Sequence, residues 1–422
     1  MKVKVEAQEQ VQVKVEDKVK AEAEKKVKVK AVGKVEAKVK GEERRKALVF
    51  TLGALLLFVT NTALSQPQPE PQPSSSFPQP EPQPSQPQPA PVERHLANIR
   101  QLTVGMQNAE AYFSSNGEKL IFQSTHDFAD GASGTQPSEK DKGLGCYQIY
   151  VMDLEGNNIR RVSTGIGATT CGYFFPGDKR ALYSSTHLSG PNCPPKPKRE
   201  GRYRWALDDY DLFANKLDGQ GVHRLTSTAG YDAEATISPD GKTIVFTSMR
   251  DGDLDLYAMD LDGTHLRRLT HEVGYDGGAF FSPDSKRIVY RAYHPKDAAE
   301  VEEYRSLLAQ NLVEPGRLEI FVMNADGTGI RQVTTNGASN FAPFFHPDGR
   351  RIIFASNLQD QKGTFHLHLI NDDGTGMEQI TLAGSFNSFP MFSPDGTKLV
   401  WVSDRNATTR GEFNIFLADW RP

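Results

Sequence analysis

The chain has 422 residues, of which 37% are hydrophobic and 24% are charged, and its formal net charge is −4. Residues 1–46 carry about fifteen basic and about nine acidic side chains, a net of about +6, so the rest of the chain has a net charge of about −10 (−4 minus +6). An acidic folded part is a poor partner for a phosphate backbone, and we therefore expect no binding to nucleic acid.

Residues 1–46 are rich in Lys, Val, Glu and Ala and contain almost no turn residues, a composition typical of a solvated, disordered segment. The apolar stretch that follows, residues 47–65, lies after Arg44, Arg45 and Lys46 and ends with the small-residue pattern Ala63-Leu64-Ser65. These are the parts of a secretory signal peptide. The alternative is an uncleaved anchor, in which residues 47–64 span the inner membrane. Both alternatives predict that the rest of the chain is exported, to the periplasm or beyond.

Residues 66–98 form a linker whose first part, Gln66 to Pro91, consists largely of Pro and Gln. Such a composition favours extended polyproline conformations and gives a semi-rigid spacer. A module that reads proline-rich segments could bind it instead, but the composition needs no partner to explain it. We therefore expect no chemistry in the linker, and we expect contact with a membrane only through the segment that precedes it.

From residue 99 to residue 422, one short unit recurs six times. Its clearest mark is a turn such as Ser238-Pro239-Asp240-Gly241, where Pro presets φ, Asp caps its own turn and Gly adopts a left-handed conformation. The six turns lie at Phe113 to Gly117, Phe174 to Asp178, Ile237 to Gly241, Phe281 to Ser285, Phe345 to Gly349 and Phe392 to Gly396. Because one unit of short strands cannot bury its own faces, the copies must stack. We predict an all-β, six-bladed β-propeller of four-stranded antiparallel blades.

The fourth strand of each unit ends in a motif such as Arg268-Leu269-Thr270, and only five units are followed by one. The missing copy precedes the first unit, as Ile99-Arg100-Gln101-Leu102-Thr103. A ring whose last blade is completed by this amino-terminal strand has no free sheet edge. We therefore predict that the strand closes the ring and that six blades fill residues 99–422.

These repeats resemble the WD40-like PD40 repeats of the TolB propeller family, and the resemblance covers about residues 99–420. The clearest instance combines the turn at Ser238 to Gly241 with Tyr257-Ala258-Met259, Asp262-Gly263 and Arg268-Leu269-Thr270. The resemblance implies a six-bladed propeller, but the repeat is a scaffold and says little about function. TolB proteins carry an amino-terminal α/β domain before the propeller, and here a signal-like segment and a Pro/Gln linker occupy that place.

Three units are lengthened between their second and third strands, at Asp127 to Gly145, Leu188 to Asp209 and Pro295 to Arg317. In a four-stranded blade these loops all emerge on one face of the ring, so we expect three long loops to crown that face. Loops of this length usually bind, cover or gate something. The third contains a predicted helix from Asp297 to Leu312, which either packs on the propeller rim or binds a partner.

Polar residues recur at the start of the innermost strands, where we expect the mouth of a central channel. The candidate binding residues there are Asn108, Glu110, Asp232, Glu234, Asp276, Asn340 and Asn387, with Thr169 at the equivalent position of the second unit. Converging carboxylates favour a cation, and oxygen-rich sites suit Ca²⁺ or Mg²⁺, so a calcium ion in the channel is one hypothesis. The other is that these groups only solvate a water-filled channel. No cofactor is certain.

His126, His187 and His294 share one register on the same face, at the end of the second strands. Imidazole binds zinc, copper or iron, but these positions lie far apart around a ring, so packing of the loops is the favoured interpretation. Three cysteines are present, and in an exported protein one pair should oxidise. We predict Cys171 with Cys193, although the connectivity cannot be deduced from sequence and a metal role for the thiols stays open.

No catalytic motif is present: the sequence has no G-x-S-x-G, no H-E-x-x-H and no phosphate loop. The first hypothesis is therefore a monomeric, non-catalytic scaffold that binds an envelope protein or a peptidoglycan-associated partner through the loop-bearing face. The second is a metal-dependent enzyme (Ca or Zn) or ligand-binding site at the channel mouth, with Glu110, Asp232, Glu234 and Asp276 as acid, base or ligand candidates.

Overall fold

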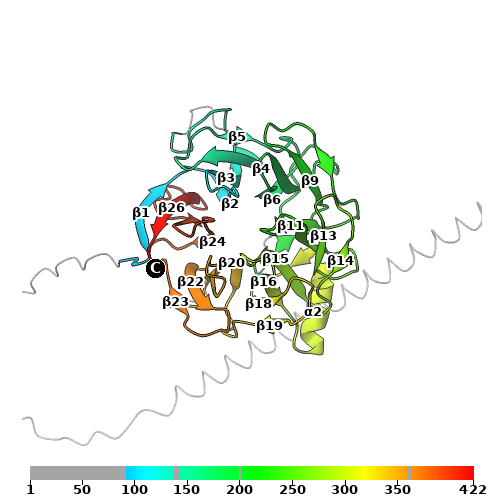
Figure 1. The fold of residues 1–422 in the computed structure, drawn as a ribbon. Coiled ribbons are helices and arrows are strands. Elements are labelled where there is room, and N and C mark those ends of the chain that lie inside the picture. Colours follow the sequence, from blue (N-terminus) through cyan, green and yellow to red (C-terminus); the bar gives the residue numbers. More distant parts are fainter. Residues whose placement is uncertain (1–91, 137–142, 199–200, 360–362) are drawn as a thin grey trace, which may run out of the picture. The chain divides into compact units, whose positions relative to one another are not determined.

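The structure is a computed structural model that describes residues 92–136, 143–198, 201–359 and 363–422. The predicted disordered segment 1–46, the signal or anchor segment 47–65 and nearly all of the linker lie outside these residues. Within the described ranges, no helix is both long and apolar enough to cross a membrane. These ranges form a ring of six four-stranded antiparallel sheets (Figure 1), which confirms the predicted fold.

The first five blades each use four strands in chain order, from the ring axis outward. Blade 1 contains β2 (Asn108–Phe113), β3 (Lys119–His126), β4 (Gly143–Asp153) and β5 (Arg160–Arg161); blade 2 contains β6 (Thr169–Phe174), β7 (Arg180–Ser185), β9 (Asp211–Lys216) and β10 (His223–Arg224). Blade 3 contains β11 (Asp232–Ile237), β12 (Thr243–Ser248), β13 (Asp255–Asp260) and β14 (Arg267–Arg268). Blade 4 contains β15 (Tyr275–Phe281), β16 (Arg287–Tyr293), β18 (Glu319–Asn324) and β19 (Arg331–Gln332), and blade 5 contains β20 (Asn340–Phe345), β21 (Arg351–Ser356), β22 (His366–Asn371) and β23 (Glu378–Gln379).

The sixth blade joins the two ends of the propeller. It contains β24 (Asn387–Phe392), β25 (Lys398–Ser403) and β26 (Asn414–Trp420), and its outer strand is β1 (Leu96–Gln101). Figure 1 shows β1 beside β26. The predicted closing strand is therefore confirmed, although it begins three residues earlier than expected. The Glu93 carboxylate reinforces the closure, because it accepts two hydrogen bonds from the Arg405 guanidinium, at 2.9 and 3.0 Å.

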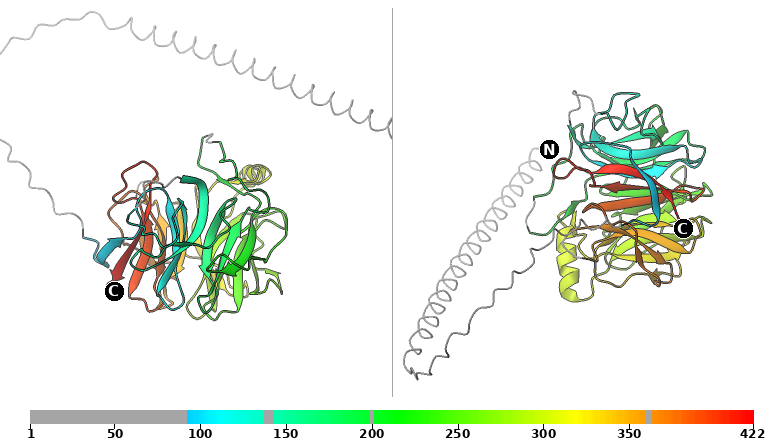
Figure 2. Two further views of the ribbon diagram at one scale, coloured as in Figure 1. Left: turned by 90° about the horizontal axis from the view of Figure 1, so that it is seen from above. Right: turned by 90° about the vertical axis from the view of Figure 1, so that its left-hand side faces the viewer.

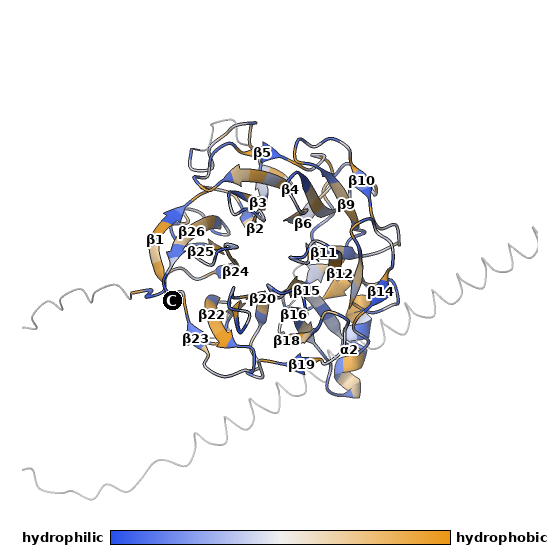
Figure 3. Cartoon of the chain, viewed as in Figure 1, coloured by the Kyte–Doolittle hydropathy of each residue, from blue (hydrophilic) through white to orange (hydrophobic). Residues whose placement is uncertain are grey.

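The recurrent turns behave as their residues predict. In blade 3 the Ser238 hydroxyl donates to Asp240 at 2.7 Å, and the Gly241 amide donates to the Ser238 carbonyl at 2.8 Å with a φ of +69° at Gly241. The next two strands, β12 and β13, are each buried at every position but one, because both faces of each strand lie against neighbouring blades. Figure 3 shows the same division, with hydrophobic residues mainly in strands and hydrophilic residues mainly in turns.

A second glycine sets how closely neighbouring blades pack. The Asp-Gly turn between the third and fourth strands lies against the preceding blade, and a Cβ at Gly263 would lie 3.0 Å from the carbonyl oxygen of Leu225. The equivalent Gly374 would place a Cβ 2.7 Å from the carbonyl oxygen of Val333. Any larger residue would push the blades apart, and both glycines also have positive φ. The repeated Asp-Gly is therefore a blade-to-blade contact as well as a turn.

Two insertions join above blade 3, which has only a short loop of its own. The short strand β8 (Trp205–Ala206) of the second insertion pairs with β17 (Leu312–Val313) of the third. Arg202 Nη1 also lies 2.9 Å from Glu314 Oε1. We call residues 201–209 together with residues 295–317 the insertion bridge. It carries helix α2 (Ala298–Leu308), and both views of Figure 2 place α2 on one face of the ring.

Helix α2 confirms the predicted amino-terminal cap but is shorter than predicted. The Asp297 carboxylate accepts hydrogen bonds from the amides of Ala299 and Glu300, both at 2.9 Å. The helix ends at Leu308, because the chain turns there to enter β17. Tyr304, Leu307 and Leu308 are buried, and the Tyr304 hydroxyl lies 2.5 Å from Asp253 Oδ1 and 2.6 Å from the Gly274 carbonyl oxygen. The helix therefore packs on the rim, over the junction of blades 3 and 4.

The first insertion does not crown the face as predicted. Its residues 127–136 run down the outer side of blade 1 instead, and its other described residues, 143–145, belong to β4. There the Gly131 amide donates to the Ile159 carbonyl at 2.8 Å, and the Gly134 amide donates to the Gly156 carbonyl at 2.8 Å. Gly156 lies in the turn after the third strand, at the opposite end of the blade from the insertions. The prediction of three crowning loops is therefore wrong for this segment, because it pairs with the edge of its own blade.

Candidate functional site at the channel

Every innermost strand has a β-bulge two positions after its predicted mouth residue, where the register with the second strand shifts. The bulged residue has positive φ in all six blades, between 49° and 59°. A bulge re-aims its side chain, here toward the ring axis. We call these six residues the channel ring: Glu110, Cys171, Glu234, Gly278, Ala342 and Phe389. Its polar members all come from blades 1 to 3.

Glu234, on the innermost strand of blade 3, forms an ion pair with Arg291 on β16, the second strand of blade 4. Its carboxylate contacts the Arg291 guanidinium and accepts hydrogen bonds from the Thr247 hydroxyl at 2.8 Å and the Gly278 amide at 2.9 Å. The Tyr275 hydroxyl lies 3.1 Å from Glu234 Oε1. Both charged side chains are largely buried. This pair links blades 3 and 4, and its carboxylate is already neutralised.

Glu110 has a different environment. It is half-buried, and among the described residues no cationic side chain lies within ion-pair distance of it; Gln123 Nε2 donates a hydrogen bond to Glu110 Oε1 at 3.4 Å. Burial, with a smaller contribution from the charge of Glu234, raises the pKa of the Glu110 carboxyl to about 7, and hydrogen bonds from Cys171 and the charge of Arg291 oppose this rise. Near neutral pH this carboxyl therefore exchanges a proton or accepts a cation readily.

Cys171 is a thiol of the channel ring and not half of a disulfide. Its amide donates to Gln123 Oε1 at 3.0 Å, and burial raises the pKa of its thiol well above the usual value. A thiol with so high a pKa is a weak nucleophile at neutral pH. It donates a hydrogen bond toward Glu110 instead.

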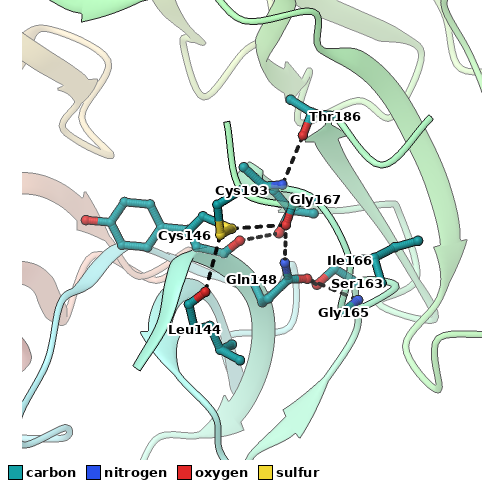
Figure 4. Close-up of a disulfide and its surroundings, with 12 residues drawn as sticks. Leu144, Cys146, Gln148, Ser163, Gly165, Ile166, Gly167, Thr186 and Cys193 are labelled. Atoms are coloured by element: carbon teal, nitrogen blue, oxygen red, sulfur yellow. Dashed lines mark hydrogen bonds between the residues drawn. A yellow bond between two sulfur atoms is a disulfide. The ribbon is translucent and has the colours of Figure 1, made fainter. Parts of the chain in front are cut away.

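The disulfide links Cys146 to Cys193 (Figure 4), so the predicted pair Cys171 and Cys193 is wrong. Cys171 lies on the innermost strand, whereas the second insertion returns across the top of β4 near Leu144, which places Cys193 at Cys146. The adjacent Gly145 has a φ of +81°, a left-handed conformation that favours glycine. The disulfide thus ties the first part of the second insertion to blade 1, whereas the last part of the same insertion, residues 201–209, belongs to the insertion bridge.

A layer of aromatic rings lies below the channel ring. Tyr112 of blade 1 packs against Phe280 of blade 4 with ring centres 5.3 Å apart, and Phe280 packs against Phe344 of blade 5 at the same distance. Tyr173 of blade 2 joins them, 6.0 Å from Tyr112. Because blades 1 and 4 stand opposite each other in a six-bladed ring, these side chains meet across the axis. These rings fill the axis of the propeller below the channel ring.

The other predicted mouth residues are not brought together in the channel. Asn108, Asp232, Asp276, Asn340 and Asn387 are at most 1% exposed and lie within the blades. Asp232 accepts from the Arg250 guanidinium at 2.9 and 3.0 Å, and Asp276 lies 3.0 Å from His294 Nε2. They tie the first strand to the end of the second. Comparing the two registers, Asp232 with Arg250 and Asp276 with His294, could have revealed this pairing from sequence.

The three register histidines pack within their own blades. His126 stacks on Phe128 at 4.2 Å, and His187 lies 4.3 Å from the ring centre of Phe213. Burial and the charge of Arg224 lower the pKa of His187. Burial also opposes the charged form of His294, but the hydrogen bond and charge of Asp276 outweigh it and raise the pKa. Among the described residues no three His, Cys, Asp or Glu side chains form a group that could hold a metal ion.

The insertion bridge contacts Arg291 and Tyr275, the two residues that hold Glu234 of the channel ring. The Arg291 guanidinium lies 5.2 Å from the ring centre of Trp205, and the Trp205 ring packs edge-on against Tyr275 at 6.2 Å. On its outer side the bridge has a groove beside α2, lined by Arg202, Tyr293, Glu300, Glu303, Tyr304, Leu307, Glu314, Gly316 and Arg317. Tyr203, next to this groove in sequence, is 64% exposed. An aromatic side chain surrounded by charged groups is common at protein interfaces.

The family model described as the TolB beta propeller domain (PD40) matches residues 206–304 and 305–420, just over half of the chain. The chain belongs to the TolB beta-propeller family. This confirms the resemblance carried by the repeats. The family match says which scaffold the chain uses, and the activity has to be argued from the surfaces that this chain adds to it.

Solved structures with the same fold are distant in sequence. A structure assigned provisionally to TolB from Agrobacterium tumefaciens is 17% identical, with a TM-score of 0.49, over 77% of this chain and 97% of that chain. TolB from Acinetobacter baumannii is 16% identical, with a TM-score of 0.47, over 75% of this chain and 65% of that chain. Hydrazine synthase from Kuenenia stuttgartiensis is 14% identical, with a TM-score of 0.50, over 71% and 43%. At these identities the likeness shows the fold alone.

Proposed function

We propose that this chain is an exported TolB-like propeller of the cell envelope and that it acts as a non-catalytic scaffold, binding a protein through the insertion bridge. The observation that carries this proposal is the construction of the bridge. The insertions of blades 2 and 4 are joined by a β-ladder and an ion pair. The insertion of blade 4 also carries a docked helix, and a disulfide fixes the insertion of blade 2 to blade 1. A surface that is ordered before binding loses little entropy when a partner arrives.

The partner that fits this surface is an envelope protein or a peptidoglycan-associated protein with both charges and an aromatic or aliphatic contact. The groove beside α2 offers carboxylates at Glu303 and Glu314 and guanidinium groups at Arg202 and Arg317. We propose that residues 47–65 direct export, either as a cleaved signal peptide or as an anchor. The TolB matches support an envelope location. We further propose that the propeller acts as a monomer.

Site-specific crosslinking in the native envelope tests the scaffold. A photo-reactive residue is placed at Tyr203 in the full chain, and a control is placed at Lys242, in an exposed turn on the opposite face. A defined protein adduct is expected at residue 203, absent at residue 242, and lost when residues 296–316 are deleted. Identical adducts at the two positions, or an adduct that survives the deletion, would overturn the proposal.

A ligand site in the channel ring is the second candidate, and Glu110 is the observation that favours it. A solvent-accessible carboxyl with a raised pKa and no cationic partner among the described residues can bind a cation or move a proton. The metal-dependent version is tested by metal analysis of protein purified without chelator, with Glu110→Gln as the matched variant. It requires a stoichiometric ion, Ca²⁺ in the first instance, that the variant loses; protein without bound metal would rule it out.

A further inference from the structure

In blades 1 to 5 the residue before the outer strand is apolar, and the exposed fraction of this residue differs sharply between blades. Val222, Leu266, Ile330 and Met377 in blades 2 to 5 are 41%, 45%, 47% and 42% exposed. The equivalent Ile159 in blade 1 is fully buried. Single exposed apolar residues are ordinary, so their exposure alone indicates nothing. Ile159 differs from the other four residues because another segment of the chain covers it.

A segment of the chain itself covers the edge of blade 1 through one antiparallel β-bridge. The Gly131 amide donates to the Ile159 carbonyl at 2.8 Å, and the Ile159 amide donates to the Ala132 carbonyl at 3.1 Å, as in an antiparallel bridge. Asp127 of the same segment lies 3.3 Å from Arg161 of β5. Residues 127–136 therefore show what this edge accepts: an acidic segment that turns on either side of a single antiparallel bridge and has small residues, Gly131 and Ala132, at the point of pairing.

Blades 3 and 4 present the same edge without a cover. Leu266 and Ile330 occupy the place of Ile159, and within the described ranges their backbone groups have no backbone hydrogen-bond partner. An unpaired strand edge is a template for another extended chain. Each edge continues into an exposed arginine, Arg267 or Arg331, which matches the acidic character of the segment on blade 1.

We propose that the outer edges of blades 3 and 4 bind an acidic segment of a partner protein through antiparallel backbone pairing, in the manner that residues 127–136 occupy blade 1. Backbone hydrogen bonds to Leu266 or Ile330 give the affinity, and the arginines select for acid. These edges lie at the ends of the blades away from the insertions. The inference is therefore independent of the scaffold function of the insertion bridge.

A peptide with the sequence of residues 127–136, DFADGASGTQ, is the probe. It is titrated into the full chain with methyl-labelled Leu and Ile, and the methyl signals of Leu266 and Ile330 are followed by NMR. The matched control peptide carries Pro in place of Gly131, which removes the amide that donates to the edge. A second protein, the variant Gly131→Pro, calibrates the assay, because φ at Gly131 is +80° and Pro there expels the covering segment and exposes Ile159.

The native peptide is expected to shift the Leu266 and Ile330 signals in a saturable way, at least about fivefold more tightly than the Pro peptide. It should also shift Ile159 in the Gly131→Pro variant only. Binding to the vacated edge at Ile159 without binding at Leu266 or Ile330 would overturn the proposal. So would equal binding of both peptides, or no binding at any edge up to about 5 mM, since backbone pairing would then supply too little affinity.

Discussion

The Arg291 guanidinium lies over the Trp205 ring, 5.2 Å from its centre, so a residue of the insertion bridge rests on a side chain that neutralises the channel ring. Trp205 is also paired through its backbone to Val313. The insertions of blades 2 and 4 therefore pack, through Trp205, against the Glu234–Arg291 ion pair. Any movement of the bridge changes the surroundings of Arg291, and through it those of Glu234.

Loss of the disulfide should loosen the second insertion. Cys146→Ser removes a crosslink between residues 47 positions apart, and we expect the free energy of unfolding to fall by about 2–4 kcal/mol. Thermal and urea denaturation measure the change. Cys171→Ser is the matched control and should cost less than about 1 kcal/mol. Mass spectrometry after alkylation of the unreduced protein in denaturant, which exposes the Cys171 thiol, should find Cys171 modified and the other two protected; a protected Cys171 would contradict the assignment.

Glu110 should make stability depend on pH in a definite direction. Its folded pKa of about 7 lies above the unfolded value of 4.5, so the folded state retains a proton that the unfolded state has lost. The contribution of Glu110 to the free energy of unfolding is therefore fully present below pH 4.5 and is lost as the pH rises through about 7. Glu110→Gln removes this dependence. We expect the variant to be more stable than the native protein at pH 8, by on the order of 2 kcal/mol, and similar at pH 4.5. Parallel urea titrations at the two pH values decide it, and a difference independent of pH would refute it.

The buried ion pair in the channel should be costly to break from one side. Arg291→Met leaves the Glu234 carboxylate buried without its cation, and we expect a loss of about 3–5 kcal/mol in the free energy of unfolding. Adding Glu234→Gln to the same chain removes the uncompensated charge and should recover most of that loss. Chemical denaturation of both single variants and the double variant measures the coupling. Additive losses would show that the two residues do not act as a pair.

Docking of helix α2 should depend on one hydroxyl. Tyr304→Phe removes the contacts with Asp253 and Gly274 and should cost about 1–2 kcal/mol. Hydrogen exchange should become faster across residues 298–308, while the blades stay protected. Ser306→Ala, an exposed position on the same helix, is the control. Equal exchange in the two variants would mean that the hydroxyl does not hold the helix.

The fold was predictable because its signals are local and repeated. Each turn such as Ser238 to Gly241 specifies its own hairpin, and the lone fourth strand before the first unit required closure of the ring. The cap at Asp297 was predictable for the same reason, since a capping carboxylate acts on amides two and three residues away.

The site was less predictable, because it depends on contacts between distant segments. Glu110 and Glu234 were found by register, but their difference arises from Arg291, a second-strand residue with no distinguishing motif. The bulges rotate Cys171 into the channel, and the return path of the second insertion decides that Cys193 meets Cys146. Neither feature leaves a periodic signal in the sequence.

The most direct test of the insertion bridge as the binding surface is the affinity of the protein captured by crosslinking at residue 203. It is measured by calorimetry against the native chain, against Tyr203→Ala combined with Arg202→Ala, and against Lys242→Ala on the opposite face. We expect the bridge variant to bind at least about tenfold more weakly and the control to bind within about twofold of the native chain. Unchanged affinity in the bridge variant, or equal weakening in the control, would contradict the assignment of the insertion bridge as the surface through which this propeller acts.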